Sequence, residues 1–173
     1  MKLIEWVRFS WDFANLPALD LELPQHYRIE PATNEDEKEL HQVISRCFRL
    51  DPVWSPALHE TLQMIESWLG RALQSDRHIC LALRHGVRII GASVLSLDPE
   101  SDNHLSPGPC ISMEYRNRGF GSCLLEHSFN ALSEAGVTRA FALTRGNTSV
   151  ARFLYPKFHG VSAPIDRTPL LAA

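Results

Sequence analysis

A change from strand to helix constrains this chain more than any other feature. The apolar run 109–113 reads as a strand, and residues 114–122 follow with two arginines and two glycines. From 120 to 135 apolar residues then recur at helical spacing, before Gly136 provides a helix stop. The chain therefore passes from strand to helix through a segment rich in arginine and glycine, which predicts a fold of mixed helix and sheet.

That junction has the chemistry of an anion site. The first turn of a helix carries N–H groups without intrahelical partners, and the summed peptide dipoles make that end partly positive. Gly119 and Gly121 have no Cβ atom to hold a bulky anion away, and Arg116 and Arg118 add charge. The segment predicts a phosphate-binding loop, with a turn that merely reverses the chain as the alternative. Neither the P-loop nor the dinucleotide-binding glycine pattern is present.

The segment 116–121, Arg-Asn-Arg-Gly-Phe-Gly, resembles the R/Q-x-x-G-x-G/A signature of the GNAT superfamily of N-acetyltransferases. The resemblance implies that this loop wraps the pyrophosphate of acetyl-CoA. It also implies that the preceding strand splays from its neighbour and offers backbone groups to the pantetheine arm. The cofactor-binding residues implied in this way are Ile111, Met113, Arg116, Asn117, Arg118, Gly119, Phe120, Gly121, Ser122 and Asn147.

A second resemblance lies downstream, where a buried strand is expected over 137–144. Asn147 would open a helix near the pantetheine, and it also suits an N-cap by its own chemistry. By resemblance, Tyr155 is the catalytic general acid that protonates the departing thiolate. Tyr155 lies one residue further from Asn147 than is usual in the family, and Pro156 biases it away from the helical region. A packing role for Tyr155 stays open.

The remaining elements follow in an order that agrees with the same family. We expect a strand at 27–31, helices over 39–48 and about 56–74, a hairpin of 78–84 with 87–97, and a polar loop over 98–109. The implied fold class is α+β, an acyl-CoA N-acyltransferase fold whose central, mostly antiparallel sheet has splayed middle strands flanked by helices.

Both ends of the chain depart from that pattern. We expect an N-terminal extension over 1–26 and an acetyltransferase domain over 27–173. After Gly160 there is room for one short strand, 161–165, where the family usually has two. The aromatic-rich N-terminal segment would patch a sheet edge, cover the acceptor cleft or mediate dimer contacts, and the sequence does not choose among these.

Composition narrows the classes of partner. A net charge of −3 over 173 residues disfavours nucleic acid and anionic membranes as partners. No apolar run approaches the ~20 residues of a membrane span, and the N-terminus lacks the apolar stretch of a secretory signal. The four cysteines are scattered without a zinc-ligand spacing. We expect a cytoplasmic protein with free thiols, no metal site and, as one option, a homodimer.

The resulting functional hypothesis is transfer of the acetyl group of acetyl-CoA to a primary amine by direct attack in a ternary complex. The alternative is a non-catalytic acyl-CoA-binding or regulatory domain. The acceptor, a small-molecule or peptide amine, is not identified, and Trp54 either lines its pocket or packs in the core. Available bases are Glu30, Asp98, His104 and Glu114, and we assign none.

Overall fold

The computed structural model describes residues 5–165, which form two antiparallel sheets and three main helices. The strands are β1 (Trp6–Asp12), β2 (Tyr27–Pro31), β3 (His78–His85), β4 (Arg88–Ser96), β5 (Cys110–Ile111), β6 (Arg139–Arg145) and β7 (Val161–Ile165). The helices are α1 (Glu37–Arg49), α2 (Leu58–Gln74) and α3 (Phe120–Glu134). Short helical turns join them, including Pro52–Ala57 before α2 and Val150–Leu154 after β6.

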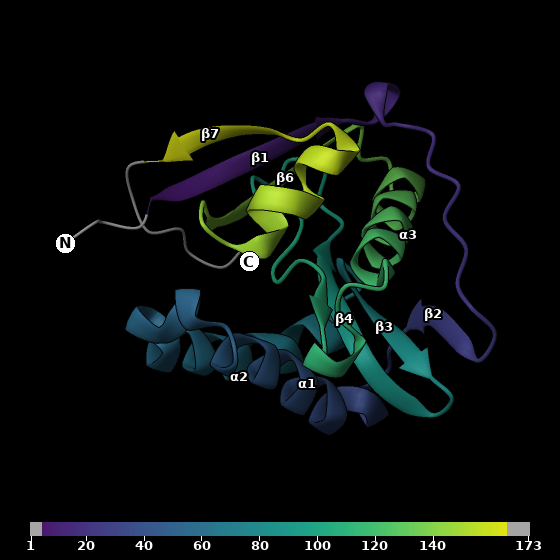
Figure 1. The fold of residues 1–173 in the computed structure, drawn as a ribbon, viewed down its shortest axis with the longest axis vertical. Coiled ribbons are helices and arrows are strands. Elements are labelled where there is room, and N and C mark those ends of the chain that lie inside the picture. Colours follow the sequence, from purple (N-terminus) through teal and green to yellow (C-terminus); the bar gives the residue numbers. More distant parts are fainter. Residues whose placement is uncertain (1–4, 166–173) are drawn as a thin grey trace.

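The four-stranded sheet, in the order β2-β3-β4-β5, is covered on both faces, with α1 and α2 on one side and α3 on the other (Figure 1). Successive strand side chains point to opposite faces. Cys80 and Ala82 of β3 accordingly join the core beneath α1 and α2, while Leu81 and Leu83 join the core around α3. Burial on both faces explains why β3 and β4 read as continuous apolar runs.

The three-stranded sheet, in the order β6-β1-β7, has the N-terminal strand at its centre. β1 pairs antiparallel with β6 from Trp6↔Arg145 to Asp12↔Arg139, and with β7 on its other side. Phe9 and Trp11 of β1 lie in the same core as α3. After residue 160 the structure describes one strand, β7, and β1 supplies the further strand of this sheet from the other end of the chain.

The two sheets separate between β5 and β6. β5 pairs with β4 at two positions, Gly91↔Ile111 and Ala92↔Cys110, and no pairing between β5 and β6 is recorded among the strands of residues 5–165. The backbone groups that β5 turns away from β4 therefore face the opening between the sheets. This separation creates the room for a cavity.

Most expected elements appear within a few residues of their predicted bounds, and two details differ. The strand expected over 109–113 is only Cys110–Ile111, because Met113–Tyr115 already turns as a 3₁₀ helix. Tyr155 keeps helical backbone angles, φ −62° and ψ −41°, despite the following proline. Within the described part of the chain, none of the helices combines the length and apolarity that crossing a bilayer requires.

Candidate active site

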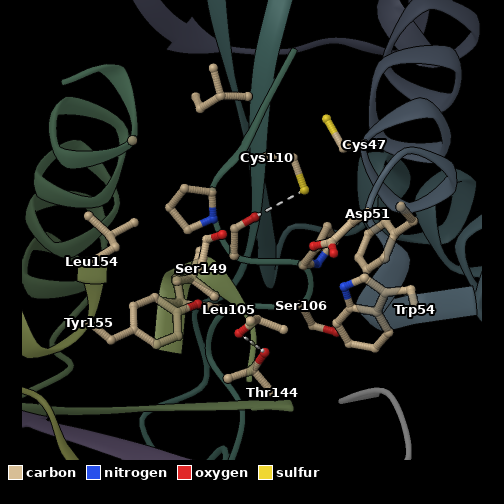
Figure 2. A pocket seen from close by; sticks show the side chains of 18 of the residues that line it. Cys47, Asp51, Trp54, Leu105, Ser106, Cys110, Thr144, Ser149, Leu154 and Tyr155 are labelled. Atoms are coloured by element: carbon tan, nitrogen blue, oxygen red, sulfur yellow. Dashed lines mark hydrogen bonds between the residues drawn. The ribbon is translucent and has the colours of Figure 1, made fainter. Parts of the chain in front are cut away.

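A cavity of about 650 Å³ opens where β5 and β6 part. Its walls come from β1 at Trp6, the end of α1 with the segment into α2, α2 as far as Trp68, the loop 103–109 with β5, the start of α3, and the end of β6 with the turn after it. Figure 2 shows labelled side chains of the segment 47–54, the loop into β5, β6 and the turn after β6 around a common centre. A cavity of this size, mostly apolar with a few convergent polar groups, is typical of a small-molecule site.

The start of α3 presents unpaired amides to this cavity. The first intrahelical bond runs from the Cys123 N–H to the Gly119 carbonyl, at 3.2 Å. Within residues 5–165, no acceptor is recorded for the N–H groups of Phe120, Gly121 and Ser122. These three donors lie at the positive end of the helix dipole, so the local structure is that of an anion site.

The two glycines of this turn leave open space in front of the amides. Gly119 has φ +84°, a left-handed conformation that favours glycine. Gly121 is different, because a Cβ atom there would meet only the Leu154 Cδ2 atom at 3.6 Å, which is ordinary contact. The protein's own packing therefore does not require glycine at 121.

Positive side chains stand beside these amides. Arg116 lines the cavity and donates its Nε–H to the Ile111 carbonyl at 2.9 Å. Lys157 also lines the cavity and donates to the Ser122 hydroxyl at 2.9 Å. Sequence reasoning missed Lys157, because nothing in a linear sequence places it against a serine 35 positions earlier. Its proximity to Tyr155 in the chain is the only available signal.

The structure gathers most, but not all, of the predicted site residues. Those that line the cavity are Ile111, Arg116, Asn117, Gly119, Phe120, Gly121, Ser122 and Tyr155. Met113, Arg118 and Asn147 do not line it. Met113 is 50% exposed on the 3₁₀ turn, and the Arg118 guanidinium lies 5.5 Å from the centre of the Tyr115 ring.

Asn147 does not cap the turn that follows β6. It is exposed, and the side-chain oxygen that accepts from this turn belongs to Thr148, which bonds the Ala151 N–H at 3.3 Å. The Thr148 hydroxyl also donates to the Arg145 carbonyl at 2.9 Å. The prediction that Asn147 caps this turn was therefore wrong by one residue. Thr148 caps it, and Thr148, unlike Asn147, lines the cavity.

A π-helical turn explains the spacing of Tyr155. Over Val150–Leu154 the chain adopts π geometry, and the Tyr155 N–H donates to the Val150 carbonyl, five residues back, at 2.8 Å. Such a turn absorbs one extra residue without moving the residues after it. Pro156 then starts a short 3₁₀ turn, a position where its missing N–H costs nothing. The proline is thus compatible with a helical Tyr155.

The Tyr155 side chain is held from behind and reaches the cavity with its hydroxyl (Figure 2). It is 2% exposed, and its ring packs edge-on against Phe9 and Trp11 with centroids 5.1 and 4.9 Å away. A Cβ atom at Gly108 would overlap the Tyr155 Oη atom, so glycine at 108 makes room for the hydroxyl. Burial raises the pKa of the Tyr155 phenol, which keeps its proton in place at neutral pH.

Cys110 in the cavity wall is a poor nucleophile. Cys110 of β5 lies beside Cys47 of α1, and contact with the Cys47 thiol together with burial raises the Cys110 pKa. Cys110 also donates weakly to the Gly108 carbonyl, at 3.5 Å. The thiolate is the reactive form of cysteine, so a protonated, half-buried Cys110 acts as a small apolar side chain.

The bases considered from sequence do not reach the cavity. Glu30 is paired with Arg84 at 2.7 Å. His104 is fully buried with both ring nitrogens engaged: Nε2 donates to the Asp98 carbonyl and Nδ1 accepts from the Phe141 N–H, each at 2.9 Å. The carboxylates that do line the cavity are Asp51 and Glu60, neither of which was expected there from the sequence.

Comparison with known proteins agrees with this geometry. The model of the acetyltransferase (GNAT) family matches residues 37–161. A search of curated proteins by sequence finds no match. Among solved structures, a GCN5-related N-acetyltransferase from Ralstonia eutropha JMP134 superposes with a TM-score of 0.64 at 15% identity, covering 83% of this chain and 98% of the other.

Other solved structures share the fold at similar distance. A GNAT-family acetyltransferase from Colwellia psychrerythraea superposes with a TM-score of 0.69 at 13% identity, covering 94% of this chain and 54% of the other. The acetyltransferase AAC(6')-Iy, in complex with a CoA-containing bisubstrate analogue, superposes with a TM-score of 0.56 at 13% identity, covering 78% and 90%. The chain thus spans about half the length of some of the structures it matches.

At these identities the structural likeness establishes the fold, and it confirms the expected mixed architecture with antiparallel sheets parted in the middle. The family match establishes the class, which is an acyltransferase whose members use acetyl-CoA. The matched span 37–161 contains the open amides of α3, the parted strands and Tyr155. This chain therefore belongs to the acetyltransferase (GNAT) family.

Proposed function

We propose that this protein transfers the acetyl group of acetyl-CoA to a primary amine by direct attack within a ternary complex. The observation that supports this proposal is that two functional groups line the same cavity. It brings together the unpaired amides at the start of α3 and the buried phenol of Tyr155. An anion-binding end and a proton donor within one cavity are the parts that this reaction needs.

The residues present fit acetyl-CoA as a substrate. The amides of Phe120, Gly121 and Ser122 would hold the pyrophosphate, with charge from Arg116 and Lys157. The open space in front of Gly121 is the observation that supports this fit, because packing within the protein does not account for it. The edge of β5 that does not pair with β4 would hydrogen-bond with the pantetheine arm, and Arg116, which donates to the Ile111 carbonyl at 2.9 Å, lies at this edge.

The chemical step balances with Tyr155 as the acid. The lone pair of a neutral amine attacks the thioester carbonyl carbon, a C–N bond forms and the C–S bond breaks. Tyr155 gives its phenolic proton to the departing sulfur, so free CoA thiol leaves. The attacking nitrogen loses one proton to solvent, and the phenol regains one from solvent. The net change is one proton moved from nitrogen to sulfur, with no oxidant or metal needed.

Two measurements test this proposal. With acetyl-CoA and an amine substrate, initial velocities at varied concentrations of both should give intersecting lines. Replacing Tyr155 with Phe should lower kcat about 10²-fold and leave the KM for acetyl-CoA within twofold, since the ring keeps its packing. Parallel lines, together with thiol release in the absence of amine, would instead indicate an acetylated enzyme intermediate. That result would contradict direct attack by the amine. CoA binding without turnover of any amine would indicate a regulatory domain.

A further inference from the structure

The cavity carries opposite charge at its two sides. Among the described residues that line it, four have ionisable charged side chains: Arg116, Lys157, Asp51 and Glu60. The two cations belong to the side formed by β5 and the start of α3, where Lys157 contacts Ser122. The two carboxylates come from the segment between α1 and α2 and from the first turn of α2. One side thus suits an anion and the other a cation.

Asp51 has one carboxylate oxygen to spare. Its Oδ1 atom accepts the Val53 N–H at 3.1 Å, which caps the short turn Pro52–Ala57. No bond is recorded for Oδ2, and over residues 5–165 no cationic side chain lies within 4.0 Å of the Asp51 carboxylate. Figure 2 shows the Asp51 carboxylate pointing toward the middle of the cavity, near Trp54. The cap holds this carboxylate in place while leaving an acceptor free.

Aromatic rings stand next to that carboxylate. The Trp54 ring packs edge-on against Trp6 of β1 and Phe48 of α1, with centroids 5.8 and 5.0 Å away, and all three line the cavity. Arg145 fixes this wall from outside the cavity, because its Nη1 donates to the Val53 carbonyl at 2.8 Å. The Arg145 guanidinium already lies 5.8 Å from the centre of the Trp6 ring and 5.7 Å from that of the Trp54 ring, so these rings give the cavity an apolar wall, and the attraction for an organic cation comes from the Asp51 carboxylate beside them.

A side-chain amide donor also lines the same cavity. Asn103 is 4% exposed and lines the cavity. Its Oδ1 atom accepts the Leu143 N–H at 3.3 Å, whereas no acceptor is recorded for its Nδ2 group among the described residues. The Nδ2 group keeps some exposure to the cavity, so it is available as a donor to a ligand that carries an oxygen or ring acceptor.

From these groups we infer that the acetyl acceptor is bound as a small organic monocation, a primary amine on an aromatic or similarly apolar body with no acidic group, and that its ammonium group gives one proton to solvent before the neutral amine attacks. This inference rests on the proposed function. An acceptor with its own carboxylate would place like charges beside Asp51 and Glu60. A polyamine would leave the wall of Trp6, Phe48 and Trp54 without an apolar partner.

A panel of matched amines tests the inference. With acetyl-CoA, we expect 2-phenylethylamine to release thiol with a kcat/KM at least about tenfold above that of L-phenylalanine, which adds only a carboxylate, and above that of spermidine. Preference for L-phenylalanine or spermidine would overturn the inference while leaving acetyl transfer intact. If no amine releases thiol, calorimetry on the CoA-loaded protein decides. Binding of 2-phenylethylamine there supports the recognition site without the catalytic proposal, and no binding overturns the inference.

Two variants that each remove one negative charge test whether Asp51 is the carboxylate that recognises the amine. Asp51→Asn keeps an oxygen to cap Val53, so the local turn survives. We expect it to raise the KM for 2-phenylethylamine about tenfold and leave the CoA-induced thermal shift unchanged. Glu66→Gln removes the same charge from an exposed position of α2 that does not line the cavity, and it should leave all three amines unaffected. Equal effects of the two variants, or none from Asp51→Asn, would overturn the assignment of Asp51.

Discussion

Glycine occupies positions 108, 121 and 160 of this protein for different physical reasons. At Gly108 a Cβ atom would overlap the Tyr155 hydroxyl, and at Gly160 it would come within 2.7 Å of the Tyr155 carbonyl oxygen and 2.8 Å of the Trp11 Nε1 atom. Both positions therefore serve the placement of Tyr155. At Gly121 nothing in the protein crowds a side chain, and glycine there weakens a helix by up to about 1 kcal/mol relative to alanine. Packing within the protein therefore does not account for glycine at 121, and the proposed pyrophosphate site does.

The Gly108→Ala variant separates the proton donor from the substrate site. The added methyl group must displace the Tyr155 hydroxyl, while the amides at the start of α3 are untouched. We expect kcat to fall at least tenfold and the dissociation constant for CoA, measured by calorimetry, to stay within twofold. A control variant, Ser133→Ala at an exposed position of α3 outside the cavity, should leave both quantities unchanged. Wild-type kcat in Gly108→Ala would contradict the role of Tyr155.

Asp36 gives the fold a pH dependence. Its carboxylate accepts the Thr33 N–H at 2.9 Å and pairs with Arg84 at 2.9 Å. The Thr33 N–H, followed by Arg84, lowers the Asp36 pKa below its ordinary value. Because the folded-state pKa is the lower one, this contribution is complete above the unfolded pKa of about 3.9 and disappears as the pH falls through the folded value.

Replacing Asp36 with Asn should therefore cost about 1–3 kcal/mol of unfolding free energy at pH 7, because a partly buried Arg84 loses a charged partner. Urea unfolding at pH 7 and near pH 3 checks this. The difference between wild type and variant should shrink at the lower pH. A constant difference across that range would show that ionisation of Asp36 does not contribute.

At the scale of elements, the start of α3 could be predicted from the sequence, whereas the π turn before Tyr155 could not. The strand, loop and helix over 109–135 are local patterns, in which glycine, arginine and apolar spacing each act on neighbouring residues. The π turn over Val150–Leu154 instead depends on Tyr155 being anchored by Phe9 and Trp11, more than 140 residues away. No local signal distinguishes a π turn from a longer helix.

The predicted cofactor residues are likewise a local motif, whereas the cavity wall proposed to bind the acceptor is formed by residues far apart in the sequence. Gly119 to Ser122 form one local motif, so a pattern identifies them together. Asp51, Trp54 and Lys157 come together only through the packing of α1, β1 and the turn at 156–158. The reason is that neighbouring residues determine a helix end, whereas tertiary contacts determine the opposite wall of the cavity.

At the scale of the whole molecule, the two ends of the chain complete one sheet. β1 lies between β6 and β7, and without it neither strand has a hydrogen-bonding partner in that sheet among residues 5–165. Phe9 and Trp11 of β1 also support α3 and Tyr155, with Trp11 only 1% exposed. We therefore propose that residues 5–26 of the segment 1–26, expected from sequence to be an extension, fold as one unit with the rest.

Removal of residues 1–26 should abolish cooperative unfolding, because it deletes the central strand and opens the core at Trp11. The milder variant Trp11→Ala should cost about 3–5 kcal/mol. Urea titrations followed by circular dichroism check both. A truncated chain that unfolds in one transition and binds CoA like the full chain would show the segment to be a separable extension.

The central claim is that the start of α3 binds the pyrophosphate of acetyl-CoA, and calorimetric titration with CoA tests it most directly. Three proteins are compared: wild type, Gly121→Val, and Asn130→Val, which adds the same side chain at an exposed position of α3 outside the cavity. Wild type and Asn130→Val should bind alike, and CoA at a hundredfold excess over the dissociation constant should stabilise each by about 2.7 kcal/mol. Gly121→Val should remain folded and bind at least about a hundredfold more weakly. A folded Gly121→Val with wild-type affinity would contradict the account.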